Sequence, residues 1–237
     1  MCGRFTMHHG IDELVARFKI AELQAQLDLS YDIAPSQQVA VVTEKAGSRI
    51  LDRYKWGLVP HWAEDESIGY KMINARAETV AVKPSFKSAL KQRRCLIPAD
   101  GFFEWRREGQ KKIPQHFRLK NGETFGFAGL WETWKPKSSD EAPLHSCTII
   151  TTEANSVVAP IHNRMPVILR PEFEEAWLDP DLDDTDELVQ FLKPFEAEME
   201  AYEVSTKVNT PAFDAPECIE PSGDETPRSE AKAKNST

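Results

Sequence analysis

The sequence predicts an α+β protein whose core is a curved, largely antiparallel β-sheet, barrel-like in shape and flanked by helices. Many short runs of β-branched and aromatic residues are separated by turn signals, whereas helical periodicity occurs at only a few places. The 237 residues, 41% of them hydrophobic, suffice to bury one sizeable core. We therefore expect a single domain over residues 1–221.

The first half of the chain begins with a helix and continues with strands. Ile11, Leu14, Val15 and Phe18 fall on one face at helical spacing after a glycine, which predicts a helix that covers the core. Two apolar runs, Val39 to Thr43 and Ile50 to Val59, then predict strands. Trp56 in the second run is expected to lie in the core.

A short basic helix is expected from Pro84, which suits a first helical turn, to Arg93, with Phe86 and Leu90 as an i,i+4 apolar pair. Short strand-like runs follow, broken by the turn signals DG, EGQKK and NGE, and their short connections favour antiparallel pairing. These runs cover residues 95–98, 102–106, 113–119, 124–131 and 147–152. Residues 173–177 and 186–192 predict two later helices.

The C-terminal residues 222–237 read SGDETPRSEAKAKNST and contain no aromatic or bulky aliphatic residue. Such a segment buries too little apolar surface to offset its ordering entropy. We expect a disordered tail.

Composition excludes several classes of protein. No apolar run reaches the roughly 18 residues of a membrane helix, and the start MCGRFTMHHG lacks the apolar stretch of a secretory signal, which predicts a cytoplasmic protein. The four cysteines are too dispersed for a disulfide framework, and neighbouring His8 and His9 cannot easily share one ion. We expect no metal, no cofactor and no membrane partner.

The net charge of −9 argues at first against a nucleic-acid partner, but its distribution is uneven. Between Lys71 and Lys120 there are 13 basic and 4 acidic residues, a local balance of +9. From Pro171 to Glu203 there are 13 acidic residues and one basic residue, and we expect this stretch to face solvent away from any phosphate. An ordinary solvated surface with uneven charge is the alternative interpretation.

Cys2 carries unusual chemistry if Met1 is removed, as commonly happens before a small residue. The free residue then holds an α-amine and a thiol, whose ordinary pKa values of roughly 8 and 8.5 leave a usable fraction of each nucleophile at neutral pH. The amine can form an imine with an aldehyde, and the thiolate can close onto the same carbon to give a five-membered ring. The alternative is an incidental small residue near a frayed terminus.

Eight ordered blocks connect this chemistry to a known family. They are MCGRF, YDIAPSQ, WGLVPHW, NARAET, RCLIPADGFFEW, ITTEAN, HNRMPVIL and VNTPAFDAPECIEP, spread over roughly residues 2 to 221. With these blocks the chain resembles the SOS-response-associated peptidase (SRAP) family, which crosslinks to abasic DNA. The resemblance implies the SRAP-like fold and a DNA partner, namely single-stranded DNA that contains abasic sites. It also implies a monomeric protein that associates with damaged DNA in the nucleoid.

The resemblance assigns four catalytic residues. Cys2 matches the nucleophile, and Asn74 matches the asparagine that orients the amine and the sugar, although alone it is also typical of a turn or a helix cap. Glu104 matches a glutamate that transfers protons, and His162 matches an acid and base for the imine. Without the resemblance, Glu104 would be read as solvent-facing and His162 as a structural histidine.

The resemblance also assigns DNA contacts. Arg4 and Arg76 correspond to arginines that clamp phosphate, and Trp62 with Pro60 would form an apolar ledge for a neighbouring base. Thr151 is expected to hydrogen bond with the glutamate or the sugar.

The resulting hypothesis is a protein that removes its own Met1 and captures the ring-opened abasic sugar as a thiazolidine crosslink, with lyase chemistry as a side reaction. Two other hypotheses remain open: a general cysteine-type peptidase that attacks other chains, and a noncovalent module for single-stranded or modified DNA in which Cys2 is inert.

Overall fold

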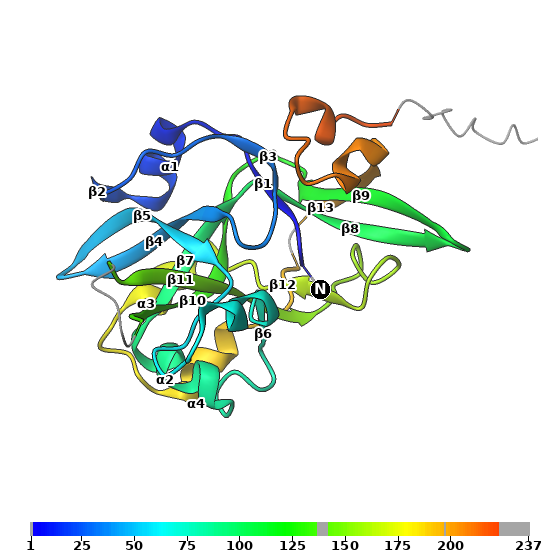
Figure 1. Cartoon of the computed structure of the whole chain (residues 1–237). Helices are drawn as coiled ribbons and strands as arrows, with labels where there is room; N and C mark the ends of the chain where they lie inside the picture. Colours follow the sequence, from blue (N-terminus) through cyan, green and yellow to red (C-terminus); the bar gives the residue numbers. More distant parts are fainter. Residues whose placement is uncertain (1, 137–141, 197, 223–237) are drawn as a thin grey trace, which may run out of the picture.

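The computed structural model describes residues 2–136, 142–196 and 198–222, and Figure 1 shows the arrangement of their helices and strands. The predicted tail lies outside these residues except for Ser222. The strands are β1 Phe5–Met7, β2 Ile20–Leu23, β3 Ser30–Ile33, β4 Gln38–Lys45, β5 Ser48–Trp56, β6 Asn74–Arg76, β7 Arg94–Ala99, β8 Gly101–Glu108, β9 Lys111–Leu119, β10 Phe125–Trp134, β11 Leu144–Glu153, β12 Arg164–Pro166 and β13 Met199–Glu203.

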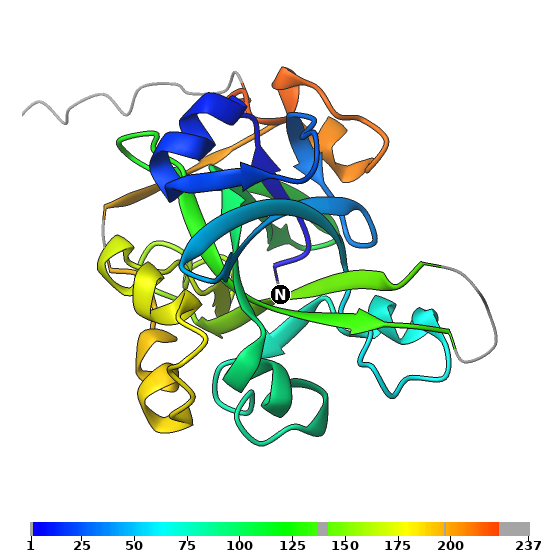
Figure 2. The same ribbon diagram turned by 90° about the vertical axis from the view of Figure 1, so that its left-hand side faces the viewer.

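The larger sheet closes into a barrel, as the sequence predicts. Its order is β12-β11-β10-β7-β4-β5-β2, and an additional pairing joins β11 to β5, so that strands β11, β10, β7, β4 and β5 form a closed ring. The pairs within the ring are antiparallel except β11 with β5, which is parallel. The turned view in Figure 2 shows the strong curl of these strands. Each of the five ring strands is paired on both sides, whereas β12 and β2 remain at the two ends of the sheet.

The smaller sheet has the order β13-β9-β8-β1-β3, and all of its pairs are antiparallel. Strands β8 and β9 form a ribbon that projects from the barrel (Figure 1). The sequence suggests a hairpin at Asp100 and Gly101, but β7 and β8 on either side of them belong to different sheets. These two residues are therefore the corner at which the chain passes from the barrel to the second sheet.

The described part of the chain contains four α-helices. They are α1 Ile11–Phe18, α2 Pro84–Gln92, α3 Pro171–Leu178 and α4 Thr185–Leu188. Short 3-10 helices are η1 Glu66–Lys71, η2 Val189–Phe191, η3 Thr206–Asn209 and η4 Pro216–Cys218. The first two helices match the predicted boundaries because Leu14 and Phe18 of α1, and Phe86 and Leu90 of α2, are buried as their spacing requires.

Two sequence interpretations need adjustment. Strand β5 ends at Trp56, three residues before the expected Val59, and Trp56 lies in the core as predicted. The acidic stretch after Pro171 does not all face solvent: Glu174 is buried and pairs with Arg17, with 2.7 Å between Nη2 and Oε1. The ion pair with Arg17 offsets part of the free-energy cost of burying the Glu174 carboxylate.

The acidic stretch also neutralises part of the basic segment. Pairing of β13 with β9 brings Glu200 to Arg118 at 2.7 Å and Glu198 near Lys120 at 3.4 Å. Only part of the local positive charge counted in the sequence is therefore available to phosphate. None of the helices among the described residues has the length and apolar character required to span a bilayer.

Candidate functional site

The segment that leads into β1 holds Cys2 in the interior. Its side chain is fully buried, and the Asn74 Nδ2 amide donates a 2.8 Å hydrogen bond to the Cys2 carbonyl oxygen. The Arg4 carbonyl oxygen accepts the Phe103 N–H at 3.0 Å. These bonds tie residues 2–4 to β6 and β8, and Figure 1 shows the start of the chain running from the N-terminus to β1. From the family resemblance Asn74 is expected near Cys2, and the structure places these two residues in contact.

Glu104 lies on β8, opposite Gln115 of β9, and is 4% exposed. Burial raises the pKa of its carboxyl to about 7, against the opposing effect of the positive amino terminus of the chain. A carboxyl with this pKa exists in both protonation states at neutral pH. It can therefore accept or donate a proton, as the family resemblance implies for a catalytic acid and base.

The Cys2 thiol does not have the ordinary pKa that the sequence argument used. Burial raises its pKa far above the usual range, and the negative charge of nearby Glu104 raises it further. The thiol is therefore protonated at neutral pH in this arrangement. It needs a base in order to act as a nucleophile, unlike the activated cysteines of hydrolases, whose pKa is depressed.

His162 follows the turn after β11 and is partly buried. Its Nδ1 lies 3.0 Å from the backbone N and 3.1 Å from the carbonyl O of Arg164, which fixes the orientation of the ring. Burial lowers the pKa of the imidazole, and the positive charges of the amino terminus and Arg164 act in the same direction. The ring is therefore largely neutral near pH 7, and proton transfer would use Nε2 because Nδ1 is engaged.

A cleft of about 530 Å³ joins Glu104 and His162 to residues that the sequence interpretation did not select: Trp105, Arg107, Lys112 and Asn209. Arg107 and Lys112 face each other across the β8–β9 ribbon, an arrangement of like charges that is unfavourable without an anion. Among the described residues neither side chain has an ion-pair partner. The sequence signal for this pair is the run WRREGQKK, because a tight hairpin turn at its centre places Arg107 opposite Lys112.

Two of the expected DNA contacts lie at the surface. Arg76 is exposed and lies two residues after Asn74 on β6, so that both side chains leave the strand on the same side. Within the described residues Arg76 has no ion-pair partner. The side chain of Trp62 is 47% exposed in the loop after β5.

Three other expected contacts have different surroundings. Arg4 is buried, and its guanidinium binds the Asp32 carboxylate at 2.5 Å and the Val208 carbonyl oxygen at 2.6 Å, so it joins β1 to β3 and η3 and does not present itself to phosphate. Pro60 is buried and offers no ledge beside Trp62. The Thr151 hydroxyl is buried and donates to the Ala75 carbonyl oxygen at 3.3 Å, which supports β6 from β11.

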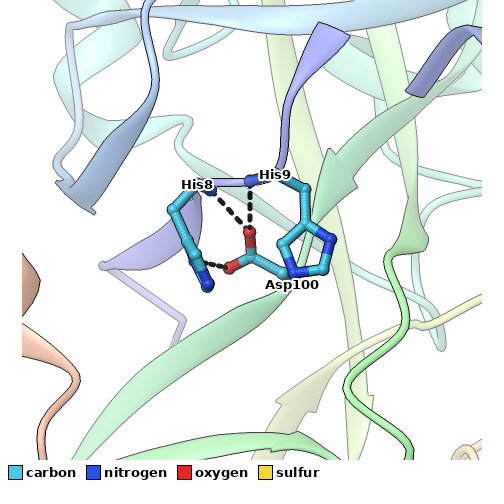
Figure 3. A group of neighbouring side chains, drawn as sticks. All are labelled: His8, His9 and Asp100. Atoms are coloured by element: carbon cyan, nitrogen blue, oxygen red, sulfur yellow. Dashed lines mark hydrogen bonds and ion pairs between the residues drawn. The ribbon is translucent and has the colours of Figure 1, made fainter. Parts of the chain in front are cut away.

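One group of metal-ligand atoms lies outside the cleft, at the far end of β1. His8, His9 and Asp100 each offer one such atom, and these atoms all lie within 4.8 Å of one another (Figure 3). Two adjacent histidines are not expected to approach one ion easily, but the chain turns at this point and brings both His8 and His9 to the same carboxylate.

The fold and the site define a class: barrel proteins of the α+β type in which the residue after the initiator methionine is buried near a carboxyl and a carboxamide, and the carboxyl shares a cleft with an imidazole. The family model for SOS response associated peptidases (SRAP) matches residues 1–211, and the chain belongs to this family.

Relatives and solved structures agree with this assignment. The chain is 47% identical over 224 residues to the abasic site processing protein YoqW of Bacillus subtilis, covering 93% of this chain and 99% of that protein. It is 35% identical to the abasic site processing protein HMCES of Gallus gallus, over 74% of this chain and 59% of that protein. A crystal structure of a protein from Bacteroides thetaiotaomicron matches with a TM-score of 0.84 and 31% identity, over 93% of this chain and all of that one.

Proposed function

We propose that this protein processes abasic sites by forming a covalent crosslink between Cys2, exposed as the N-terminal residue after removal of Met1, and the ring-opened sugar in single-stranded DNA. The observation that carries the proposal is the position of Cys2: it is held by Asn74 and lies close enough to Glu104 for the carboxylate charge to act on its thiol. The names of the relatives, abasic site processing proteins, support the choice of lesion.

The reaction begins with the sugar. The abasic deoxyribose is a hemiacetal in equilibrium with its open aldehyde, and proton transfer by Glu104 assists the opening. The Cys2 amine attacks the aldehyde carbon to give a carbinolamine, which loses water to form an imine. The neutral His162 ring accepts a proton from the attacking amine and returns it to the departing hydroxyl.

The second bond closes the ring. The Cys2 sulfur attacks the imine carbon, the π electrons move to nitrogen, and the thiol proton is transferred to that nitrogen through Glu104. The product is a thiazolidine. Because the pKa of the thiol is raised by burial, the carboxylate form of Glu104 is needed as the base for this step. The Asn74 hydrogen bond to the Cys2 carbonyl oxygen keeps both nucleophiles on one side of the sugar.

Removal of Met1 is required before the amine exists, and we propose that the protein performs it. Glu104 would take the proton of the Cys2 thiol, and the sulfur would attack the Met1 carbonyl carbon. As the carbon–nitrogen bond breaks, Glu104 would return that proton to the Cys2 nitrogen, which leaves as the free amine, and the Met1 acyl group would remain on sulfur as a thioester. Water then hydrolyses the thioester and releases methionine. A general peptidase is less well supported because the Cys2 thiol is fully buried and its pKa is raised.

The DNA path is proposed to cross two basic positions on either side of the lesion. Arg76 lies beside Asn74, and Arg107 with Lys112 lines the cleft near Glu104. Trp62 offers an exposed ring on which a base can stack, without preference for its identity. A single strand suits such a path because its sugar can leave the base stack without disrupting pairing.

The proposal is tested by incubating the protein with a single-stranded oligonucleotide that contains one abasic site and separating the products on a denaturing gel. We expect a shifted band for the wild type and none for Cys2→Ser. Cys2→Ser and Cys2→Ala both keep the amine, so a reversible imine or strand nicking is expected to remain in both variants. Cys218→Ser is the matched control, because Cys218 is also a buried free thiol but belongs to η4, near the end of the described chain.

The outcomes separate the hypotheses. A retarded band on a native gel but none on a denaturing gel would indicate the noncovalent binding module. Cleavage of an unrelated unfolded protein that disappears in Cys2→Ser would indicate the general peptidase. An undiminished crosslink in Cys2→Ser would reject the proposed chemistry altogether.

A further inference from the structure

A group of side chains that the proposed reaction does not use lies where the end of β1 meets the junction of β7 and β8. His8 and His9 follow β1, and Asp100 lies between β7 and β8. The Asp100 carboxylate is almost fully buried, whereas the two imidazoles are partly exposed at its outer side. Figure 3 shows both histidines arranged around this carboxylate.

The carboxylate is held in place independently of any metal. The His8 backbone N–H donates to Asp100 Oδ2 at 2.5 Å and the His9 backbone N–H donates to the same atom at 3.3 Å, while the Thr6 hydroxyl donates to Oδ1. Oδ1 also lies 2.9 Å from His8 Nδ1. The backbone and hydroxyl donors fix the carboxylate in the way that outer partners orient metal-binding carboxylates.

The geometry points to a binding site for a divalent first-row transition metal, with His8, His9 and Asp100 as its three protein ligands. Zinc bonds of about 2.0–2.2 Å to nitrogen and oxygen place two tetrahedral ligands about 3.4 Å apart. His8 Nδ1 and Asp100 Oδ1 lie 2.9 Å apart, which is shorter than this value, and one ligand atom from each of the three residues already lies within 4.8 Å of the others. Small rotations of the two partly exposed imidazoles would bring the three atoms to the spacing of a bound ion.

The surroundings of the histidines fit the same chemistry. Glu13 of α1 contacts His9 Nδ1, an arrangement that leaves Nε2 for a metal and is commonly seen around metal-bound imidazoles. The His8 ring stacks on Tyr31, with ring centroids 5.2 Å apart, which limits its rotation. Two imidazoles and one carboxylate with open positions suit zinc or iron(II) better than magnesium or calcium, which prefer oxygen ligands.

A metal at this corner would connect three elements that otherwise meet through hydrogen bonds. His8 and His9 follow β1, and Cys2 precedes the same strand; Asp100 lies between β7 and β8, and β8 carries Glu104. Binding would therefore stabilise the relative placement of β1 and β8 without contributing an atom to the cleft.

The test uses the full chain and zinc chloride as the probe, with bound zinc measured by equilibrium dialysis and elemental analysis. We expect one zinc per chain, and at least tenfold weaker binding in His8→Ala and in His9→Gln. His61→Ala is the matched control with unchanged binding, because His61 also lies beside a carboxylate, 3.3 Å from Glu132, but has no second histidine there. Unchanged affinity in both test variants would overturn the inference.

Cobalt(II) substitution gives a measurement that does not depend on variants. A nitrogen and oxygen site gives ligand-field bands in the visible range without intense thiolate charge-transfer absorption in the near ultraviolet. Charge-transfer absorption would place the metal on a cysteine and contradict the proposed ligand set, as would the absence of stoichiometric binding.

Discussion

Two buried carboxyls lie four residues apart, one on each side of Gly101, and their pKa values move in opposite directions. Asp100 is 3% exposed and Glu104 is 4% exposed, so burial alone does not distinguish them. Burial raises the pKa of Glu104 to about 7. At Asp100 burial also acts to raise the pKa, but hydrogen bonds from His8 and Thr6 together with the charge of His8 lower it overall.

The difference distinguishes a structural carboxylate from one suited to proton transfer. Asp100 is stabilised as an anion by a set of donors that also shapes the corner between the two sheets. Glu104 faces a cleft and keeps a pKa near neutrality, where acid and base chemistry is most efficient. The comparison predicts that substitutions at the two positions have effects of different kinds.

The largest effect is expected for Glu104→Gln. Loss of a proton-transfer group should slow crosslinking by about 10²- to 10⁴-fold, because the thiol and amine lose their base. The rate is measured from the time course of the covalent band under single-turnover conditions. Glu108→Gln, in an exposed position on the same strand, is the control. A Glu104→Gln rate within a factor of three of the wild type would contradict the assigned role.

Gly101→Ala tests the corner between the two carboxyls. A Cβ at this position would lie 2.1 Å from His116 Nε2 and 2.9 Å from Thr6 Oγ1, and His116 is itself buried. We expect the free energy of unfolding to fall by about 3 kcal/mol, as for overpacked cores. Urea denaturation measures the change. Gly10→Ala meets nothing within 4 Å and should cost less than about 1 kcal/mol. Equal losses for the two variants would contradict this packing.

The pH dependence of stability separates the two carboxyls directly. The folded-state pKa of Glu104 is above its ordinary value of 4.5, at about 7, so the folded protein binds more protons than the unfolded one between these values. The stability of the wild type relative to Glu104→Gln should therefore fall as pH rises from 4.5 to about 7, by no more than about 3 kcal/mol, and stay constant above that range.

The pKa of Asp100 is lowered below its ordinary 3.8, so its stabilising contribution is lost only at lower pH. The stability difference between the wild type and Asp100→Asn should therefore be constant from pH 4.5 to about 5.5, below the range in which imidazoles ordinarily lose their proton. Urea midpoints from pH 4.5 to 8 measure the Glu104→Gln difference, and those from pH 4.5 to about 5.5 measure the Asp100→Asn difference. The assignment of the two carboxyls would be contradicted if the stability difference between the wild type and Glu104→Gln did not change with pH. It would also be contradicted if the difference between the wild type and Asp100→Asn changed with pH in its range.

The same contrast between structure and function applies to two arginines and gives the smallest expected effect. Arg76→Ala should weaken DNA binding and reduce the slope of log affinity against log salt by about 1, because one phosphate contact disappears. Arg4→Ala should instead lower stability, because it removes a buried ion pair with Asp32. Fluorescence anisotropy with a labelled single strand measures the first effect. An unchanged salt slope in Arg76→Ala would reject the contact.

Much of the fold could be predicted because the elements are local. The spacing of Leu14 and Phe18 predicts α1, and the run from residue 113 to 119 lies within β9. The sequence predicts a barrel-like sheet but does not indicate which strands close it, because closure depends on pairing of β5 with β11, which lie far apart in the chain and run parallel. The dipeptide at Asp100 and Gly101 indicates a turn but does not say that the two strands enter different sheets.

The sequence indicates candidate site residues where residue chemistry is distinctive, as at Cys2, and where the family resemblance assigns a role, as at Asn74. Burial and partners were not. Arg4 looks like a phosphate ligand in sequence because Asp32 and the Val208 carbonyl, its partners, lie in other parts of the chain. The pKa of Cys2 likewise depends on its complete burial and on Glu104, which no local pattern reveals.

The account depends on two nucleophiles of one residue reacting with one carbon atom. Mass spectrometry of the gel-purified adduct, digested with protease and nuclease, tests this most directly. We predict a peptide that begins at Cys2, lacks Met1 and carries the sugar remnant at a mass that requires loss of one water, with both the amine and the thiol blocked. A remnant on a lysine, or on a peptide that retains Met1, would contradict the proposed reaction.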